Sequence, residues 1–449
     1  MKASPHFVRR SLGRTSAADS HVYGRRRLGI VGQMKTGGVL AALLATTACA
    51  GSPMQVTTRP PPLDALPRLL TVAEIKVRDA ANGFSFAFWG ALNAAQRDVN
   101  VFISPLSASF ALGMTMNGAA NQTYSEMRTA LQFGGASLAE IDGGYKSLVA
   151  LLVGLDPIVQ IQVANSIWYR QEFPFRQTFF DSTKAYFDAT VRGLNFGDAP
   201  GSLATINGWV NSATNGRIPA VLSDIRSDQV MFLINVIYFN GKWRTPFDPA
   251  ETNTATFTGA GGTTQSARLM HRLDTLSYAE TATYQAADLP YGNSAFTMTV
   301  LLPKAGTSVE TLAAALTPAT WQAIVGGFRT TKIDFSLPRL KLSYERKLND
   351  DLKSLGMVSP FNPGGADFTQ MAAAPVGTQL FIDFVKQNTF VDVNEAGTEA
   401  AAATTVGIGV TALPVVPIMR VDRPYVFVLR ERLSGTVLFM GKIVRMPTS

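Results

Sequence analysis

Cysteine and histidine are scarce in this sequence of 449 residues, which holds one Cys and three His. The lone Cys49 excludes an intrachain disulfide and a zinc site built from several cysteines. His6 and His21 lie near the N-terminus, so a histidine-based catalytic site elsewhere depends on His271 alone. The sequence also lacks the G-x-S-x-G, H-E-x-x-H and G-x-x-x-x-G-K-[ST] motifs. We therefore expect neither metal nor cofactor, and a secreted hydrolase is nearly excluded.

Charged residues make up only 16% of the chain, and the excess of positive charge is local. The formal net charge is +8, from 40 Lys and Arg against 32 Asp and Glu. Residues 1–48 hold eight of the basic residues and one acidic residue, which leaves 32 basic against 31 acidic residues from Cys49 onward. A body with a net charge of +1 has no bulk attraction for phosphate, so we expect no nucleic-acid partner.

The position of the single cysteine suggests a lipid anchor. From Met34 the sequence has one Lys, an apolar run over residues 39–45 and small residues up to Cys49, which resembles a bacterial lipoprotein signal. We interpret residues 1–48 as a leader, with a mis-assigned start over 1–33, and residues 49–71 as a lipidated Cys and a flexible, Pro-rich tether. The protein is then exported and anchored in a membrane of the cell envelope. The alternative is a plain secretory signal cleaved near Ala50, which predicts a secreted protein.

The remainder, residues 72–449, contains no linker and predicts one large domain. Helical spacing predicts a helix over Val72–Gln96, and Ser104 before Pro105 predicts the start of a second helix. Runs rich in β-forming residues follow and end in a hairpin, so the fold class is α+β. The predicted strands are Ile161–Tyr169, Met231–Tyr238, Phe296–Leu302, Lys332–Leu342, Phe381–Val393, Tyr425–Leu429 and Thr436–Ile443.

About 29 residues after Glu395 lack a sustained helical pattern, a length that is typical of a functional loop. The even positions from Thr398 to Val410 carry only Thr, Ala, Val and Ile, whereas the charged Glu399 falls on an odd position. This alternation is the period-two signature of a strand with one buried face. This segment therefore has the length of a loop but the alternating pattern of a strand.

The start of this loop resembles the hinge of inhibitory serpins, a family of protease inhibitors. Other segments resemble the same family in the family's own order, from about residue 72 to 447. The matching segments are the hinge run Glu395–Thr404, the shutter turn Asn100–Ser107, helix F at Asn207–Ile218, the strand and breach region Asn235–Trp243, and the closing strand Phe439–Ile443.

The resemblance implies a fold and a mechanism. The fold is the serpin fold, with a large mixed main sheet, smaller sheets, about eight or nine helices and a mobile reactive-centre loop. In the mechanism, a protease cleaves the loop, and the freed loop inserts as a strand into the main sheet before the acyl-enzyme is hydrolysed. Gly397 permits the bend, small side chains enter between strands, and Glu399 points outward. The hinge residues are Glu395, Gly397, Thr398, Glu399, Ala400, Ala401, Ala402 and Ala403.

Four residues stand where the family controls the opening of the main sheet: Ser104, Ser107, Asn235 and Trp243. Each also has a purely structural interpretation, because the two serines are spaced as a helix cap and Trp243 is an ordinary core residue type. The family often has a His in the strand before the hinge. Gln387 stands there, which argues against a protonation switch of the sheet.

The bond that the protease cleaves is predicted by counting residues from either end of the loop. From Glu395 the family's usual spacing ends at Thr411, which gives Thr411-Ala412, whereas counting back from the far end of the loop points to Leu413. Leu413-Pro414 is a poor bond because Pro lacks the N–H, so Ala412-Leu413 is the second choice. No candidate offers Lys or Arg. We therefore expect elastase-like or subtilisin-like proteases as targets.

Two functional classes are favoured by the sequence. The first is a suicide inhibitor of serine proteases, which the unbroken run of small hinge residues favours, since non-inhibitory serpins usually carry a bulky, charged or Pro residue there. The second is a serpin fold used only for binding. The expected partners are a target serine protease, held covalently, and a membrane reached through a lipid anchor at Cys49. We expect a monomer that is not an enzyme.

Overall fold

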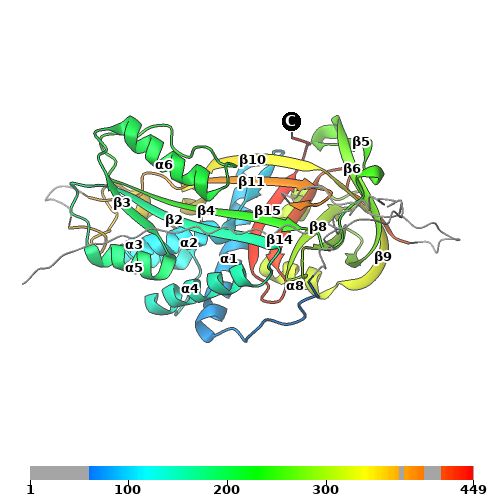
Figure 1. The fold of residues 1–449 in the computed structure, drawn as a ribbon, viewed down its shortest axis with the longest axis horizontal. Coiled ribbons are helices and arrows are strands. Elements are labelled where there is room, and N and C mark those ends of the chain that lie inside the picture. The colour runs from blue at the N-terminus through cyan, green and yellow to red at the C-terminus, as the bar shows by residue number, and fades with distance from the viewer. Residues whose placement is uncertain (1–59, 374–378, 399–415, 448–449) are drawn as a thin grey trace, which may run out of the picture. The chain divides into compact units, whose positions relative to one another are not determined.

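Helices dominate the first part of the chain, and strands dominate the rest (Figure 1). The computed structural model describes residues 60–373, 379–398 and 416–447, and residues 58–449 form one unit. The first helix begins at Val72, as predicted, because Thr71 and Glu74 form a capping box. The α-helices within these ranges are α1 (Val72–Ala95), α2 (Pro105–Met116), α3 (Asn121–Ala130), α4 (Leu138–Gly154), α5 (Gln177–Phe187), α6 (Ala199–Ala213), α7 (Val309–Ala314), α8 (Pro318–Gly326) and α9 (Asn349–Ser354).

A six-stranded sheet runs through the centre of this unit (Figure 1). Its two middle strands, β4 and β11, are separated at one end by the very short strand β12. In spatial order the strands are β10 (Leu340–Lys347), β11 (Lys386–Asn394), β12 (Gly397–Thr398), β4 (Met231–Lys242), β2 (Val159–Arg170) and β3 (Thr190–Leu194).

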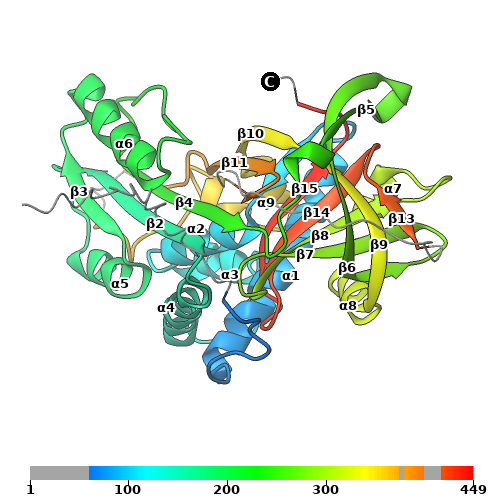
Figure 2. The ribbon, with the colours of Figure 1, turned by 45° about the vertical axis from the view of Figure 1, so that its right-hand side comes forward.

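A nine-stranded sheet packs beside it and curls strongly at its far edge (Figure 2). Three of its central strands are buried along their whole length. Two of these three form the hairpin that the sequence predicts before the C-terminus. In spatial order its strands are β1 (Val101–Ile103), β15 (Val437–Ile443), β14 (Tyr425–Glu431), β8 (Phe296–Pro303), β7 (Tyr284–Pro290), β6 (Thr264–Glu280), β9 (Arg329–Pro338) and β13 (Ile418–Arg420), with β5 (Asn253–Thr258) paired to β6. The α+β class is confirmed.

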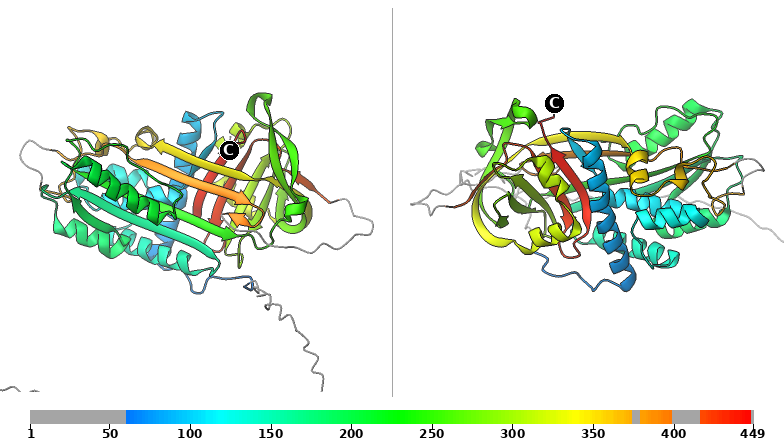
Figure 3. Two further views of the ribbon diagram at one scale, coloured as in Figure 1. Left: turned by 45° about the horizontal axis from the view of Figure 1, so that its top comes forward. Right: turned by 180° about the vertical axis from the view of Figure 1, so that it is seen from behind.

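Helices cover both faces of the six-stranded sheet. On one face, Ile206 and Val210 of α6 pack on Trp168, Phe232 and other side chains of β2 and β4. The other face carries α2 and α4, which contact β4 and β2, whereas α1 packs on these two helices and on β15 of the nine-stranded sheet, as the view from behind in Figure 3 shows.

Two predicted strands have different boundaries in the structure. The run Lys332–Leu342 is two strands, because Pro338 ends β9 and the chain passes at Arg339 into β10 of the other sheet. The run Phe381–Val393 is a strand only from Lys386 onward. At the first boundary the pairing partner changes from β6 to β11, and at the second the backbone before Lys386 bonds to Asn349 and Leu348 outside the sheet.

The described end of the predicted tether lies against the body. Arg244 donates to the carbonyl of Pro60 over 3.2 Å, and the backbone N–H of Leu63 donates to Asn293 O over 2.7 Å. Arg432 donates to the carbonyl of Leu63 over 2.6 Å. In the part of the chain that the structure describes, no helix is both long and apolar enough to span a bilayer.

Candidate functional site

The hinge residues Gly397 and Thr398 form β12 between the two central strands of the six-stranded sheet. Thr398 pairs with Val393 of β11 and with Gly241 of β4, both in antiparallel register. Its side chain is 2% exposed, and its hydroxyl lies 2.8 Å from the hydroxyl of Tyr291. The first inward-facing residue of the hinge is therefore already inside the sheet.

Gly397 is required by the close approach of two backbones. Its φ is +152°, and a Cβ at this position would lie 2.1 Å from the carbonyl oxygen of Gly241. The movement of a side chain could not relieve that contact, because the opposing atom is a backbone oxygen of β4. The absence of a side chain thus lets β12 pack against β4 in this backbone conformation.

Glu395 anchors the chain just before β12. Its carboxylate oxygen Oε1 accepts hydrogen bonds from Arg339 Nε over 2.7 Å and from Thr252 Oγ1 over 2.6 Å, and the residue is 7% exposed. Burial raises the pKa of Glu395, but the hydrogen bonds from Arg339 and Thr252 outweigh it and hold the pKa below its ordinary value. The carboxylate is therefore charged at neutral pH and fixes the turn into the hinge.

Trp243 and Tyr291 cover the point where the hinge enters the sheet. The Trp243 indole donates to Asn394 O over 2.8 Å, and its backbone N–H donates to Ala396 O over 2.9 Å. The two rings are stacked with centroids 4.3 Å apart. Burial raises the pKa of Tyr291 far above its ordinary value, so its hydroxyl stays protonated beside Thr398.

Sequence reasoning missed Tyr291 and Arg339. Tyr291 is followed by Gly292 and Asn293, which mark a turn but not its partner across the sheet. Arg339 follows Pro338 inside a run that resembled a single strand. Their roles depend on contacts with residues 56 or more positions away, for which the local sequence carries no signal.

The start of α2 connects the two strands on either side of the gap. Ser104 exchanges two backbone hydrogen bonds with the side-chain amide of Gln387 on β11, at 3.0 and 2.8 Å. Ser107 Oγ donates to the side chain of Asn235 on β4. Ser104 also caps the helix, since its Oγ accepts from Ser107 N over 3.3 Å. The capping role and the contact with the sheet thus occur together, and the amide of Gln387 carries no titrating proton.

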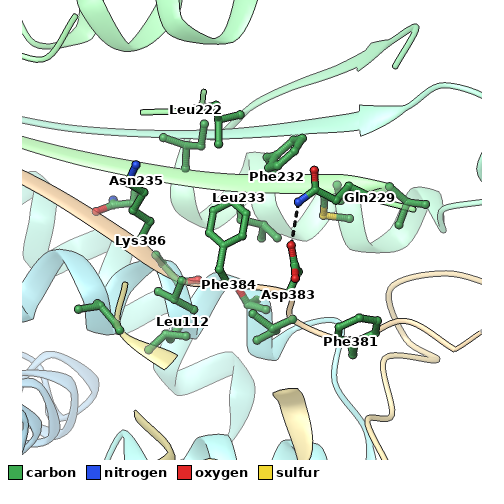
Figure 4. A pocket seen from close by; sticks show the side chains of 18 of the residues that line it. Leu112, Leu222, Gln229, Phe232, Leu233, Asn235, Phe381, Asp383, Phe384 and Lys386 are labelled. Atoms are coloured by element: carbon green, nitrogen blue, oxygen red, sulfur yellow. Dashed lines mark hydrogen bonds between the residues drawn. The ribbon is translucent and has the colours of Figure 1, made fainter. Parts of the chain in front are cut away.

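Below β12, a cavity of about 200 Å³ separates β4 from the segment that leads into β11 (Figure 4). We call the space between residues 231–240 of β4 and residues 381–392 the slot. Its walls include many apolar side chains, among them Leu112, Leu233 and Phe384, and its polar lining residues include Asn235, Gln387 and Asp383. The slot continues from the end of β12 along the direction of β4.

Several predicted site residues lie outside the described residues: the hinge positions Glu399, Ala400, Ala401, Ala402 and Ala403, the reactive-bond candidates Thr411, Ala412 and Leu413, and the lipidation candidate Cys49.

His271 is placed on strand β6, away from the slot. Its Nε2 lies 3.0 Å from Asp334 and its Nδ1 3.5 Å from Glu251, so carboxylates face both ring nitrogens. Within the described ranges, no cluster of three or more His, Cys, Asp or Glu could hold a metal ion. The chemistry that the described site supports is strand addition between β4 and β11.

Comparisons with known proteins agree with this geometry. The model of the family "Serpin (serine protease inhibitor)" matches residues 79–446. Neuroserpin of Gallus gallus is 30% identical over 385 residues, covering 83% of this chain and 90% of that protein. The native crystal structure of the thermophilic serpin tengpin has a TM-score of 0.76 at 29% identity and covers 86% of this chain and 97% of its own. Human thyroxine-binding globulin shares the fold, with a TM-score of 0.75 at 23% identity and coverage of 84% and 100%. A hinge paired between two central strands, in a chain matched over its whole body, shows that this protein belongs to the serpin family.

Proposed function

We propose that this protein is a suicide-substrate inhibitor of serine proteases, which traps the acyl-enzyme by inserting its cleaved loop into the slot. The observation that carries the proposal is β12, because Gly397 and Thr398 already form ladder pairs with both strands that flank the slot. Insertion then extends an existing strand, and the unfavourable first pairing has been made before cleavage. Membership of a family composed mainly of protease inhibitors supports the same function.

The register of β12 defines the partners that the following loop residues would meet. From the pairs of Thr398 with Gly241 and Val393, six further steps place Thr404 between Asn235 and Gln387. These two side chains are bonded to the start of α2, so Thr404 would enter between the ties that hold the sheet closed. Even positions would share the buried face of Thr398, which suits their small or apolar side chains.

The energy available is sufficient for trapping. Roughly a dozen inserted residues with ladder hydrogen bonds of about 0.5–1.5 kcal/mol each supply on the order of 10 kcal/mol. Burial of Val406, Ile408 and Val410 adds to this. A whole domain has about 5–15 kcal/mol of stability, so the distortion of a protease active site is within reach.

The bond that we propose for cleavage is Thr411-Ala412, with Ala412-Leu413 as the second choice. Small residues on both sides suit elastase-like and subtilisin-like proteases with shallow pockets. The test is to mix the protein with pancreatic elastase, subtilisin and trypsin, and to look for a covalent complex on a denaturing gel. We expect a complex with the first two and little with trypsin, with the cut located by mass spectrometry.

A binding protein without inhibition is the second candidate. Human thyroxine-binding globulin, whose structure was solved in complex with thyroxine, shows that a protein with this fold can bind a small ligand. Under this alternative the loop is cut by protease and no covalent band forms with any protease tested. The paired hinge is the observation that favours the inhibitor over this alternative.

We further propose that the protein is exported and held at a membrane through lipid on Cys49, as a monomer. The support is the apolar run before the only cysteine of the chain. Replacing Cys49 by Ser should move the protein from the membrane fraction to the soluble fraction. A wild-type protein that is already soluble and carries no lipid contradicts the anchor.

A further inference from the structure

The far end of the slot, opposite β12, is bridged by side chains. Asp383 accepts a hydrogen bond from Gln229 Nε2 over 2.7 Å and from Arg226 Nη2 over 2.8 Å. Gln229 and Arg226 precede β4, whereas Asp383 precedes β11, so these bonds cross the slot from one wall to the other. The next residue, Phe384, faces Phe232 of β4 with ring centroids 6.2 Å apart. Figure 4 shows Asp383 turned toward Gln229 and Phe384 directed toward β4.

This bridge coincides with the place where a predicted strand is missing. The sequence predicts a strand from Phe381, but β11 begins only at Lys386. The backbone of this segment bonds instead to other partners, because Val385 N–H donates to the side chain of Asn349 over 2.9 Å and Asp383 O accepts from the same side chain. The segment has strand-forming residues, but its backbone bonds to Asn349 take the place of a sheet ladder, while its side chains reach across the slot.

The register locates the bridge within the inserting loop. Counting ten steps from the pairs of Thr398, Ile408 would lie between Met231 and Asp383, and Val410 would lie next to Gln229. Residues up to 405 would meet only residues that already belong to β4 and β11. The loop could therefore enter through the shutter without disturbing the bridge, but it could not complete insertion while Asp383 holds Gln229.

We propose that Asp383 and Phe384, with Gln229, Arg226 and Phe232, form a brace that creates a second barrier in loop insertion, after the shutter. This inference rests on the proposed function. Asp383 is a positioning residue in this scheme, since it contacts neither the protease nor the scissile bond. The brace delays the last step, in which the protease is carried to the far end of the sheet and its active site is distorted.

The test compares Asp383→Ala with Asp228→Asn in the full-length protein. Asp228 also bonds Arg226, at 3.1 Å, but it does not reach across the slot, so its variant is a matched control. Subtilisin is added at a temperature at which the wild type divides between trapped complex and cleaved product. We expect Asp383→Ala to shift this ratio about tenfold toward the complex, equivalent to ~1.4 kcal/mol, while the rate of loop cleavage stays unchanged. The control should match the wild type.

Melting temperatures give a second readout that a merely structural bond would not produce. Asp383→Ala should lower the melting temperature of the intact protein and leave that of the loop-cleaved protein unchanged, because the brace is already open there. Should the Ala variant fail to fold, Asp383→Asn keeps the shape and should shift the ratio in the same direction by less. An unchanged ratio, an equal shift in the control, or an equal loss of melting temperature in both forms would overturn the brace. Absence of any complex with the wild type would instead overturn the proposed function, and the brace with it.

Discussion

The two ends of the slot are closed in different ways. At the hinge end, backbone pairs of β12 with β4 and β11 fill the space, and Glu395, Trp243 and Tyr291 hold the hinge in place. At the far end, the contacts across the slot are made by side chains, from Asp383 and Phe384. Backbone pairs extend when the next residue enters, whereas a side-chain bridge must break first. In the proposed mechanism, insertion would therefore be prepared at one end of the sheet and resisted at the other.

We expect the largest change in melting temperature when the loop fills the whole slot, because both ends are then closed by backbone pairs. A nick near Thr411 frees the loop to pair along the whole slot, and on the order of 10 kcal/mol of added stability corresponds to a rise in melting temperature of roughly 12 °C in a domain of this size. Scanning calorimetry of intact and nicked protein measures it. A verified nick with an unchanged melting temperature would show that the loop does not enter the slot.

The next largest effect is expected at Thr398. Thr398→Arg forces a charge into a position that is 2% exposed beside Tyr291, at a cost of several kcal/mol, which should push β12 out of the sheet and remove the pairs from which insertion would start. The variant should be cut at the same bond, yet release active protease in place of a covalent complex.

Glu399→Arg is the matched control, since the neighbouring position should face outward and retain most of the inhibition. Both variants are compared by the stoichiometry of inhibition of one elastase-like protease. Equal loss in the two would contradict the alternation of the hinge, and full inhibition by Thr398→Arg would contradict insertion itself.

A smaller, pH-dependent effect is expected at Glu395. Because its pKa in the folded protein is lowered, its contribution to stability is complete above the ordinary glutamate pKa of about 4.3 and is lost as pH falls through the folded value. Glu395→Gln should cost about 1–2 kcal/mol at pH 7, with a difference from wild type that shrinks in acid. Melting temperatures between pH 3 and 7 measure it, and a constant difference would contradict the ionic contact with Arg339.

The smallest effect is expected at Tyr291. Tyr291→Phe removes only the hydroxyl that meets Thr398 at 2.8 Å, a loss of about 1 kcal/mol that should loosen the paired hinge. Tyr344→Phe removes a bond of 2.9 Å to Gln96, outside the slot, and serves as the control. Hydrogen exchange of the Thr398 amide should rise about fivefold in the first variant and stay unchanged in the second.

Much of the fold could be predicted from local patterns. The cap at Thr71, Ser104 before Pro105, and the alternating or apolar runs in β2, β4 and β8 depend on near neighbours in sequence, which are the same in any context. In contrast, the strand boundaries at Pro338 and Lys386 could not be predicted from local patterns. Partners distant in sequence decide which sheet the backbone joins at the first boundary and whether it joins a sheet at all at the second.

The sequence alone determined the alternation of the loop and the small side chains of the hinge, because these follow from side-chain size and from the two-residue period of a strand. Only the tertiary structure decided which strands receive the hinge, that Arg339 and Tyr291 hold it, and that Asp383 and Phe384 brace the far end. These contacts join residues from different strands and turns. Their distances are set by the packing of the whole sheet, which no stretch of neighbouring residues encodes by itself.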